Sequence, residues 1–241
     1  MTYWNKRRLY GWGEYQEMRD LMYNEVATYL LGTAGFENHS GETILDLGCG
    51  CGIDSVEYAL GGNTVYAVDI SEESLCVANQ FAKSAGVKIV TQVEDARHLS
   101  FCDEFFDHVH CMGVLHHIVE ADKAITEMYR VLKRGGTFIA MLYNHDSLLY
   151  YHSILFLRGV QQNMFSTMTE GEILSEFSEA KRGCPYTRVY TVEEAKQLFS
   201  QFSDVSVEIH HNVYDTLTER KIHFDGPKCL GWHLVVRGRK I

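Results

Sequence analysis

The sequence predicts an α/β fold in which helices cover a mostly parallel sheet. Short apolar segments typical of strands alternate with segments of helical periodicity between about residues 43 and 143. A glycine-rich stretch at 48–52 joins the first strand to the first helix of this series, which is where open α/β sheets bind ligands. A composition of 46% apolar and 22% charged residues with two prolines supports one ordered domain with a sizeable core.

The first predicted element is one amphipathic helix over 14–31, where apolar residues recur at roughly helical spacing. Helices are also predicted from about Ile53 and after Ser71. The next helix, over 120–133, has a single apolar stripe and is expected to stop at Gly135 and Gly136. The strands predicted in this region are 43–47, 64–68, 88–93, 106–112 and 137–143.

The alternation stops after residue 143. Residues 144–185 show no regular rhythm, after which a helix is predicted from Thr191 and strands at 205–209 and 232–236. We therefore expect a single domain over 1–241. It is divided into an N-terminal helical segment (1–40), a core (41–143), an insertion (144–185) and a C-terminal part of the sheet (186–241).

Bulk composition disfavours several function classes. A formal net charge of −10 disfavours nucleic-acid binding. The N-terminus lacks the apolar segment of a secretory signal, and the longest apolar run, 148–157, is too short to span a bilayer. We expect a soluble, cytoplasmic protein. None of the seven cysteines has CxxC spacing and the histidines show no ligand spacing, so no metal is predicted.

The chemistry-bearing pattern begins at the first predicted strand. Gly48, Gly50 and Gly52 lie where the backbone must turn sharply and approach a ligand closely. Asp69 ends the second strand, where a carboxylate can accept hydrogen bonds from both hydroxyls of a ribose. A dinucleotide-binding fingerprint would read GxGxxG, whereas Ile53 occupies the third-glycine position here. This spacing disfavours a nicotinamide or flavin enzyme.

Five motifs in order resemble those of class I S-adenosylmethionine-dependent methyltransferases, particularly the small-molecule branch with the ubiquinone and menaquinone enzymes. They are Ile44-Leu45-Asp46-Leu47-Gly48-Cys49-Gly50, Val68-Asp69-Ile70-Ser71, Glu94-Asp95-Ala96-Arg97-His98-Leu99, the stretch from Phe106 to His117 that includes Met112-Gly113, and Arg130-Val131-Leu132-Lys133-Arg134-Gly135-Gly136. The family usually has proline where this chain has Arg134, a departure expected to change only a turn.

The resemblance implies a Rossmann-like, seven-stranded, mostly parallel sheet with helices on both faces and an antiparallel last strand. It implies S-adenosylmethionine as cofactor and methyl transfer to O, N or C of a small molecule, including natural products. Segment 1–40 would then form a lid, 41–143 the cofactor-binding core and 144–185 the acceptor-recognition insertion. The implied cofactor-binding residues are Asp46, Gly48, Cys49, Gly50, Asp69, Ile70, Asp95, Ala96, Met112 and Gly113.

Catalytic candidates follow the fourth and fifth core strands. His117 or His116 is the predicted general base, with Tyr143 and His145 as secondary candidates. The alternative interpretation is that one of the two histidines caps the following helix. In-line positioning of acceptor and methyl group can itself supply about 7–11 kcal/mol of the barrier reduction, so a base is optional.

Two aromatic clusters stay open to two interpretations each. The N-terminal aromatic side chains either cover the cofactor or anchor the first helix; they are Tyr3, Trp4, Tyr10, Trp12 and Tyr15. Apolar residues of 150–157 either line an acceptor pocket or form a homodimer contact. The alternatives for the whole chain are a catalytically silent protein that binds S-adenosylmethionine and, less favoured, a nucleotide-linked oxidoreductase.

Overall fold

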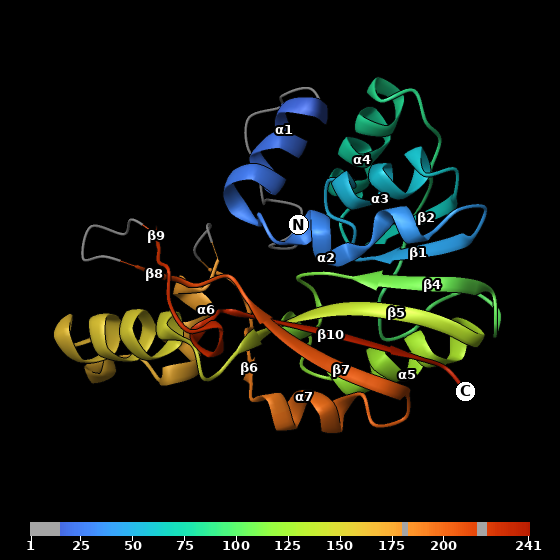
Figure 1. Ribbon diagram of the computed structural model, residues 1–241. Coiled ribbons are helices and arrows are strands. Elements are labelled where there is room, and N and C mark those ends of the chain that lie inside the picture. Colours follow the sequence, from blue (N-terminus) through green and yellow to red (C-terminus); the bar gives the residue numbers. More distant parts are fainter. Residues whose placement is uncertain (1–14, 180–182, 216–220) are drawn as a thin grey trace.

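A computed structural model of the chain describes residues 15–179, 183–215 and 221–241 (Figure 1). In these residues the core is an eight-stranded sheet with the strand order β3-β2-β1-β4-β5-β10-β7, and β6 pairs with β5 beside this path. β10 runs antiparallel to both β5 and β7, whereas the other pairings are parallel. The predicted mostly parallel sheet with an antiparallel last strand is therefore confirmed. The strands are β1 (Thr43–Leu47), β2 (Thr64–Asp69), β3 (Val90–Val93), β4 (Phe106–Cys111), β5 (Leu132–Asn144), β6 (Val189–Tyr190), β7 (Ser203–His210) and β10 (His233–Arg239).

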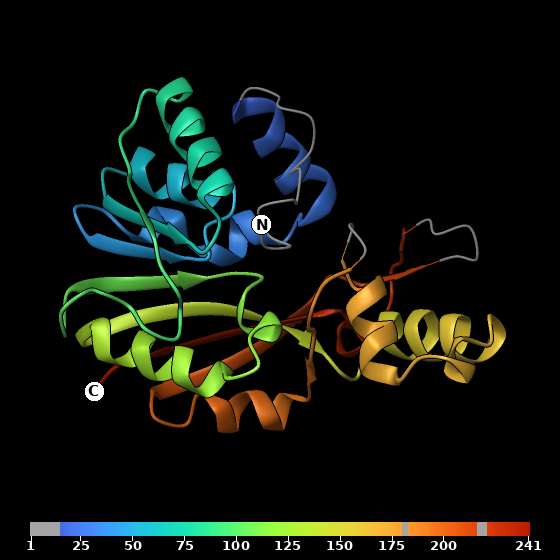
Figure 2. The same ribbon diagram turned by 180° about the vertical axis from the view of Figure 1, so that it is seen from behind.

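Helices cover both faces of the sheet because the buried strands present apolar side chains alternately to each side. Ile44 packs into one core cluster with α3 (Ile53–Leu60) and α4 (Glu72–Ser84). The next residue, Leu45, belongs to the cluster on the opposite face with α5 (Ala121–Val131) and α7 (Val192–Leu198). Figure 2 shows the two helical layers from behind.

The single N-terminal helix predicted over 14–31 is wrong, because the chain is broken there into three pieces. These are α1 (Tyr15–Leu21), the π-helical turn η2 (Met22–Val26) and α2 (Leu30–Ala34). Ala27 leaves the helical conformation with φ −130° and ψ 59°. The break lets the Tyr23 hydroxyl reach Asp54 and the Tyr29 hydroxyl reach His233, so tertiary hydrogen bonds override the local periodicity.

The prediction that Gly135 and Gly136 stop a helix is also wrong. The helix ends at Val131, and Leu132 already has extended backbone angles and begins β5. The pairing of β5 with β4 shifts between Phe106 and His108, which face Leu132 and Thr137. The two glycines lie in the bulge that this shift creates, where a Cβ at Gly136 would come within 2.9 Å of the Asp107 carbonyl oxygen.

The segment after β5 forms an arm that projects from the carboxyl edge of the sheet (Figure 1). It contains the π-helix η5 (Leu149–Gln161), the 3₁₀ turn η6 (Met164–Ser166) and α6 (Glu170–Phe177). The strands β8 (Val213–Asp215) and β9 (Lys221–His223) form a small separate sheet that contacts η5 through β8. Three further 3₁₀ turns are η3 (Phe36–Asn38), η4 (Leu115–His117) and η7 (Lys228–Leu230). Within the described parts of the chain, the helices are too short or too polar to cross a membrane.

The structure describes only some residues of the two aromatic clusters for which the sequence allowed two interpretations. Tyr15 is buried and its hydroxyl donates to Glu57 on α3, so this member anchors the first helix to the core. Tyr3, Trp4, Tyr10 and Trp12 lie outside the described residues. In the arm, Tyr150 and Ile154 are buried, whereas Tyr151 and Phe156 are exposed. The homodimer contact stays a prediction.

Candidate functional site

The loop between β1 and α3 has the sharp turn that its glycines predict. Gly48, Gly50 and Gly52 have φ of 76°, 54° and 74°, a region that side chains with a Cβ rarely adopt. The backbone N–H groups of Gly48 and Cys49 both donate to the Val68 carbonyl oxygen, at 2.8 and 2.9 Å. The loop is therefore fixed to the end of β2, next to Asp69.

Asp69 faces this loop from the carboxyl end of β2. Its Oδ2 accepts from the Gly50 N–H at 2.9 Å, and its Oδ1 accepts from the Ser71 N–H at 2.8 Å. These two bonds orient the Asp69 carboxylate toward the glycine loop. The following residue, Ile70, has 47% of its surface exposed.

A cavity of about 660 Å³ opens at the carboxyl edge of the sheet, where open α/β folds bind ligands. It is lined by eleven of the thirteen predicted site residues: Gly48, Cys49, Gly50, Asp69, Ile70, Asp95, Ala96, Met112, Gly113, His117 and Tyr143. The structure thus brings residues from five sequence segments to one cavity. Asp46 and His116 are the two predicted residues outside the lining.

Asp46 lies beneath the glycine loop and is 3% exposed. Its carboxylate accepts a hydrogen bond from the Ser55 hydroxyl on α3. Burial raises the pKa of Asp46 to about 6. In this conformation Asp46 joins β1 to α3 under the loop.

Asp95 follows β3 beside Asp69, because the Glu94 N–H donates to the Asp69 carbonyl oxygen at 3.1 Å. The Arg97 guanidinium holds Asp95 with two bonds, Nη2 to Oδ2 at 2.6 Å and Nε to Oδ1 at 3.0 Å. These bonds lower the pKa of the Asp95 carboxyl. The Arg97 backbone N–H also donates to Asp95, so the carboxylate is fixed at the cavity rim.

His116, His117 and Tyr143 meet in the other half of the site. The two histidines lie in η4 after β4, and Tyr143 lies near the end of β5. The His116 ring is fully buried and stacks on the Tyr143 ring at a centroid distance of 3.7 Å. Helix α5 has Glu120 at its N-cap with no side-chain cap bond, so neither histidine caps it and that alternative is wrong. The secondary candidate His145 bonds to Asp146 and does not line the cavity.

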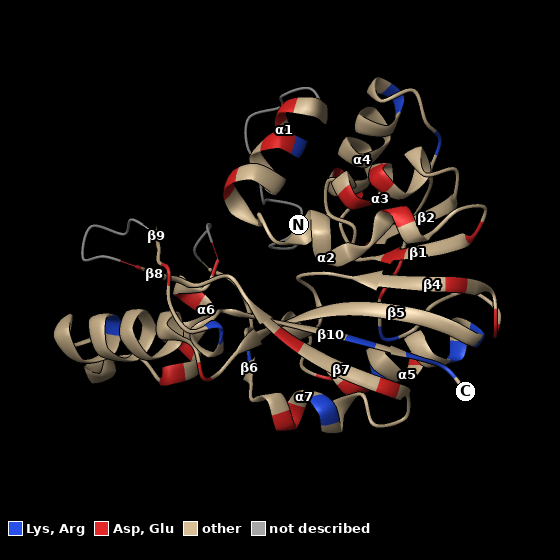
Figure 3. Ribbon diagram, viewed as in Figure 1, with Lys and Arg blue, Asp and Glu red and all other residues tan. Residues whose placement is uncertain are grey.

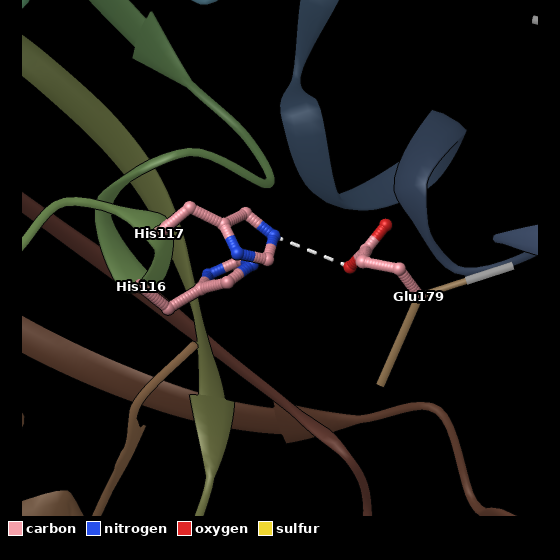
Figure 4. Close-up of side chains that lie close together, drawn as sticks. All are labelled: His116, His117 and Glu179. Atoms are coloured by element: carbon pink, nitrogen blue, oxygen red, sulfur yellow. Dashed lines mark hydrogen bonds and ion pairs between the residues drawn. The ribbon is translucent and has the colours of Figure 1, made fainter. Parts of the chain in front are cut away.

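Glu179, which the sequence analysis missed, completes this group from the end of the arm (Figure 4). Its Oε1 lies 3.2 Å from His117 Nε2 and accepts from the Tyr143 hydroxyl at 2.5 Å. The His117 and Glu179 side chains are each 5% exposed. No motif in the sequence marks Glu179, because its partner His117 lies 62 residues away.

The His117 ring is held on its second nitrogen as well. Nδ1 lies 3.0 Å from the Tyr186 carbonyl oxygen, an acceptor that requires a proton on Nδ1. Cys184 Sγ and Thr187 Oγ1 also lie near Nδ1, at 3.5 and 3.3 Å. Burial alone would lower the pKa of His117, but hydrogen bonds with Cys184 and Glu179 outweigh burial and raise it to about 9.

An aromatic wall that the sequence analysis did not predict borders the same half of the cavity. Tyr143 stacks on Trp232 at 4.3 Å, and His211 stacks on His233 at 4.5 Å with an interplanar angle of 8°. The Tyr29 hydroxyl is bonded to His233 Nδ1 at 2.7 Å. All five side chains line the cavity. Tyr29 precedes α2, Tyr143 lies on β5, His211 follows β7, and Trp232 and His233 lie where β10 begins. Only the clustering of histidines and Trp232 at strand ends could have hinted at this wall.

Along the ribbon of the described residues, positions of Lys and Arg are interspersed with positions of Asp and Glu (Figure 3). Both signs occur on α1 and α7. This pattern agrees with the net charge of −10. The cavity itself has acidic side chains at Asp54, Asp69, Glu94, Asp95 and Glu179.

Comparison with known proteins shows which proteins the core of the chain resembles. A family model described as a methyltransferase domain matches residues 45–140. The demethylmenaquinone methyltransferase of Thermobifida fusca is 36% identical over 113 residues, covering 46% of this chain and 48% of that protein. The ubiquinone biosynthesis O-methyltransferase of Pseudomonas putida (strain F1) is 33% identical over 117 residues, covering 48% and 50%. The chain thus spans about half the length of the curated relatives it matches.

Solved structures share the fold over most of the chain. A crystal structure of a SAM-dependent methyltransferase from Methanosarcina mazei superposes with a TM-score of 0.62, at 24% identity, over 84% of this chain and 94% of that one. The matched family segment contains the glycine loop, Asp69, Asp95 and both η4 histidines. Residues 45–140 therefore match a methyltransferase-domain model, and the fold is one that this chain shares with a solved SAM-dependent methyltransferase.

Proposed function

We propose that the protein transfers the methyl group of S-adenosylmethionine to a hydroxyl oxygen of a flat, largely apolar small molecule. One observation carries this proposal: a single cavity joins the glycine loop and Asp69 to the group formed by His117, Tyr143 and Glu179. The first half has the features of a nucleoside site. The second half presents polar groups on an aromatic wall.

The cofactor half supplies a distinct partner for each part of S-adenosylmethionine. Asp69 accepts hydrogen bonds from the ribose hydroxyls, and Asp95 with the Ala96 backbone receives the adenine edge. The methionine part passes over Gly48 and Gly50, where the absence of side chains leaves the backbone accessible. Carboxylates around the cavity also favour a cationic sulfonium ligand.

The acceptor half favours a ring with one hydroxyl group. Rings of Tyr143, Trp232 and His233 offer flat faces for stacking, and offset stacking contributes about 0.5–1.5 kcal/mol per ring pair. The cavity volume of about 660 Å³ falls within the range of sites that hold small molecules. The attacked atom lies beside His117 and Tyr143, the polar groups on this wall.

The chemical step needs no covalent intermediate on the protein. The acceptor oxygen attacks the methyl carbon, the bond from that carbon to sulfur breaks, and S-adenosylhomocysteine leaves with the electron pair. The hydroxyl proton passes to the pair formed by His117 and Glu179, in which the carboxylate accepts it because the raised pKa of His117 keeps that ring protonated at neutral pH. His116 lies behind Tyr143 and acts as a positioning residue, while in-line alignment provides most of the rate enhancement.

Binding measurements test the cofactor half directly. Calorimetric titration with S-adenosylmethionine, S-adenosylhomocysteine and NADPH should show binding of the first two only. Asp69→Asn should weaken S-adenosylmethionine binding about 10- to 100-fold, because one charge-assisted hydrogen bond contributes about 1.5–3 kcal/mol. Asp122→Asn on the exposed start of α5 is the matched control and should bind normally. NADPH binding without S-adenosylmethionine binding would refute the proposal.

Turnover tests the acceptor half. Hydroxylated aromatic compounds are offered with S-adenosylmethionine, and S-adenosylhomocysteine release is measured. The double variant His116→Ala/His117→Ala should lose activity while it still binds the cofactor. Activity that is unchanged across pH in this variant would remove the histidines from the proposal. Tight cofactor binding with no turnover for any acceptor would instead favour the catalytically silent alternative.

A further inference from the structure

We propose that His116, His117 and Glu179 form a binding site for one divalent transition-metal ion of the Zn²⁺ type. One ligand atom from each of the three side chains lies within 4.8 Å of the other two. Figure 4 shows the two imidazoles and the carboxylate gathered at one point, although they come from η4 and from the end of the arm. The sequence analysis predicted no metal, since Glu179 is separated from the histidines along the chain.

The donor set selects the class of ion. Two imidazoles and one carboxylate suit Zn²⁺, Fe²⁺ and their first-row neighbours, whereas Mg²⁺ and Ca²⁺ prefer sites made of oxygen atoms. Three protein ligands also leave a coordination position open, as in catalytic rather than structural zinc sites. His117 and Glu179 line the cavity, so this open position faces the acceptor half.

The separation of the ligand atoms is close to what coordination requires. Two atoms bound to one tetrahedral zinc ion lie about 3.4 Å apart, given metal–ligand bonds of about 2.1 Å. His117 Nε2 and Glu179 Oε1 are already 3.2 Å apart. His116 offers the third ligand atom, which lies within 4.8 Å of the other two.

Surrounding groups orient the ligands in the way metal sites require. The Tyr186 carbonyl oxygen, 3.0 Å from His117 Nδ1, keeps the proton on Nδ1 and directs Nε2 toward Glu179. A ligand histidine characteristically donates its other N–H to such a carbonyl. The Tyr143 hydroxyl donates to Glu179 Oε1, which is the equivalent support for the carboxylate. Cys184 lies on the Nδ1 side of the ring, away from the proposed metal position.

The site would act on the acceptor, and this role rests on the proposed function. A metal ion here replaces the proton that His117 and Glu179 otherwise share. Bound there, the ion would lower the pKa of an acceptor hydroxyl at its open position, and the hydroxyl proton would leave to solvent. The resulting alkoxide or phenolate would attack the methyl carbon while the bond from that carbon to sulfur breaks. The substrate class is then a hydroxylated small molecule whose oxygen can coordinate a cation.

Direct metal binding tests the proposal without any need for turnover. The full chain, freed of any histidine tag, is stripped with EDTA, dialysed and titrated with ZnCl₂ in a calorimeter. We expect one ion per chain with a Kd in the micromolar range or tighter, and no comparable binding of MgCl₂. Co²⁺ offers a second readout, because its visible absorption reports nitrogen and oxygen coordination. A chain that binds no Zn²⁺ overturns the proposal.

Variants locate the ion. His117→Gln and Glu179→Gln should each weaken Zn²⁺ binding at least 100-fold, and His116→Gln should do the same if it folds. His98→Gln and Glu193→Gln are matched controls at exposed positions and should leave binding unchanged. Undiminished Zn²⁺ binding in both His117→Gln and Glu179→Gln would show that the ion lies elsewhere and would overturn the site.

Measuring S-adenosylmethionine binding distinguishes failure of the proposed metal site from failure of the proposed function. S-adenosylmethionine titration of the same preparations shows whether each variant is folded and whether the cofactor half works. Zn²⁺ binding that depends on His117 and Glu179 in a chain that binds no S-adenosylmethionine would support the metal site and refute the proposed function. The converse result would leave the methyl-transfer proposal standing with the pair of His117 and Glu179 as the proton acceptor and would remove the metal.

Discussion

Two glycines of the same loop are fixed by different constraints. Gly48 and Gly50 both have positive φ, so any side chain costs about 1–2 kcal/mol at either position. A Cβ at Gly48 would lie 2.3 Å from Val114 Cγ2, whereas a Cβ at Gly50 meets no atom of the described residues within 4 Å. Gly48 is thus constrained by packing as well as by its backbone conformation, whereas within the described residues Gly50 is constrained by its backbone conformation.

Alanine at these two positions should separate stability from binding. Gly48→Ala is expected to lower the melting temperature more than Gly50→Ala, because only the first substitution adds a steric clash to the cost in φ. Gly50→Ala should retain most of its stability yet bind S-adenosylmethionine at least tenfold more weakly. Thermal melts and calorimetric titrations of both variants check this. Equal binding by Gly50→Ala and the unaltered chain would contradict the assignment of the loop.

The buried carboxyl of Asp46 has a measurable effect on stability. Burial raises its pKa to about 6, above the value of about 3.9 in an unfolded chain. The folded state therefore holds the proton more tightly, and this group's contribution to stability is lost as the pH rises from about 4 to 6. Asp46→Asn should raise the free energy of unfolding at pH 7 by up to about 3 kcal/mol, with no gain below about pH 4.

Urea denaturation at both pH values measures this difference. Asp107→Asn is a control for which the free energy of unfolding at pH 7 is expected to change in the opposite direction. Despite partial burial, the Lys133 ammonium and the Thr43 N–H keep the pKa of Asp107 low. Removing the Asp107 charge should therefore destabilise the chain at pH 7 and not at low pH. A gain for Asp46→Asn of the same size at both pH values would show that the carboxyl is not the cause.

Helices and strands whose position is determined by local sequence signals were predicted correctly. The strand at 43–47 matches β1, and Thr191 caps α7 through a capping box with Glu194. The N-terminal helix was mispredicted because hydrogen bonds from Tyr23 and Tyr29 to distant residues break it. The short strand β6 was missed because two residues give no period. Glu179 was missed for a related reason, since only folding brings the arm to η4.

The carboxyl end of β5 places Tyr143 between the sheet and the arm. Tyr143→Phe removes the hydroxyl that donates to Glu179 but keeps the ring that stacks on His116 and Trp232. We expect methyl transfer to slow by tenfold or more while S-adenosylmethionine affinity changes less than twofold. Tyr151→Phe, on the exposed face of η5, is the matched control. A parallel loss of cofactor affinity and thermal stability would instead assign Tyr143 a structural role.

The whole molecule divides its cavity between two parts of the chain. The cofactor half comes from loops at the carboxyl ends of β1, β2, β3 and β4, which lie within the matched segment 45–140. The acceptor half adds side chains from outside that segment, including Tyr29, Glu179, Tyr186, His211 and Trp232. Motifs could identify the first half alone, because its ligand is shared with a family. The second half has no shared pattern and was visible only after folding.

This division predicts two separate footprints in amide hydrogen exchange. S-adenosylmethionine alone should slow exchange at 48–54, 69–71, 94–97 and 112–114, because these loops line the cofactor half. Residues 183–187, which support His117 and Glu179, should slow only when an acceptor or, for the proposed metal site, Zn²⁺ is added. Helix η5 serves as an internal control, since its residues line neither half and should exchange at the same rate in every state. If S-adenosylmethionine alone protected 183–187 as strongly as the glycine loop, the arm would belong to the cofactor site, and acceptor recognition would have to lie elsewhere.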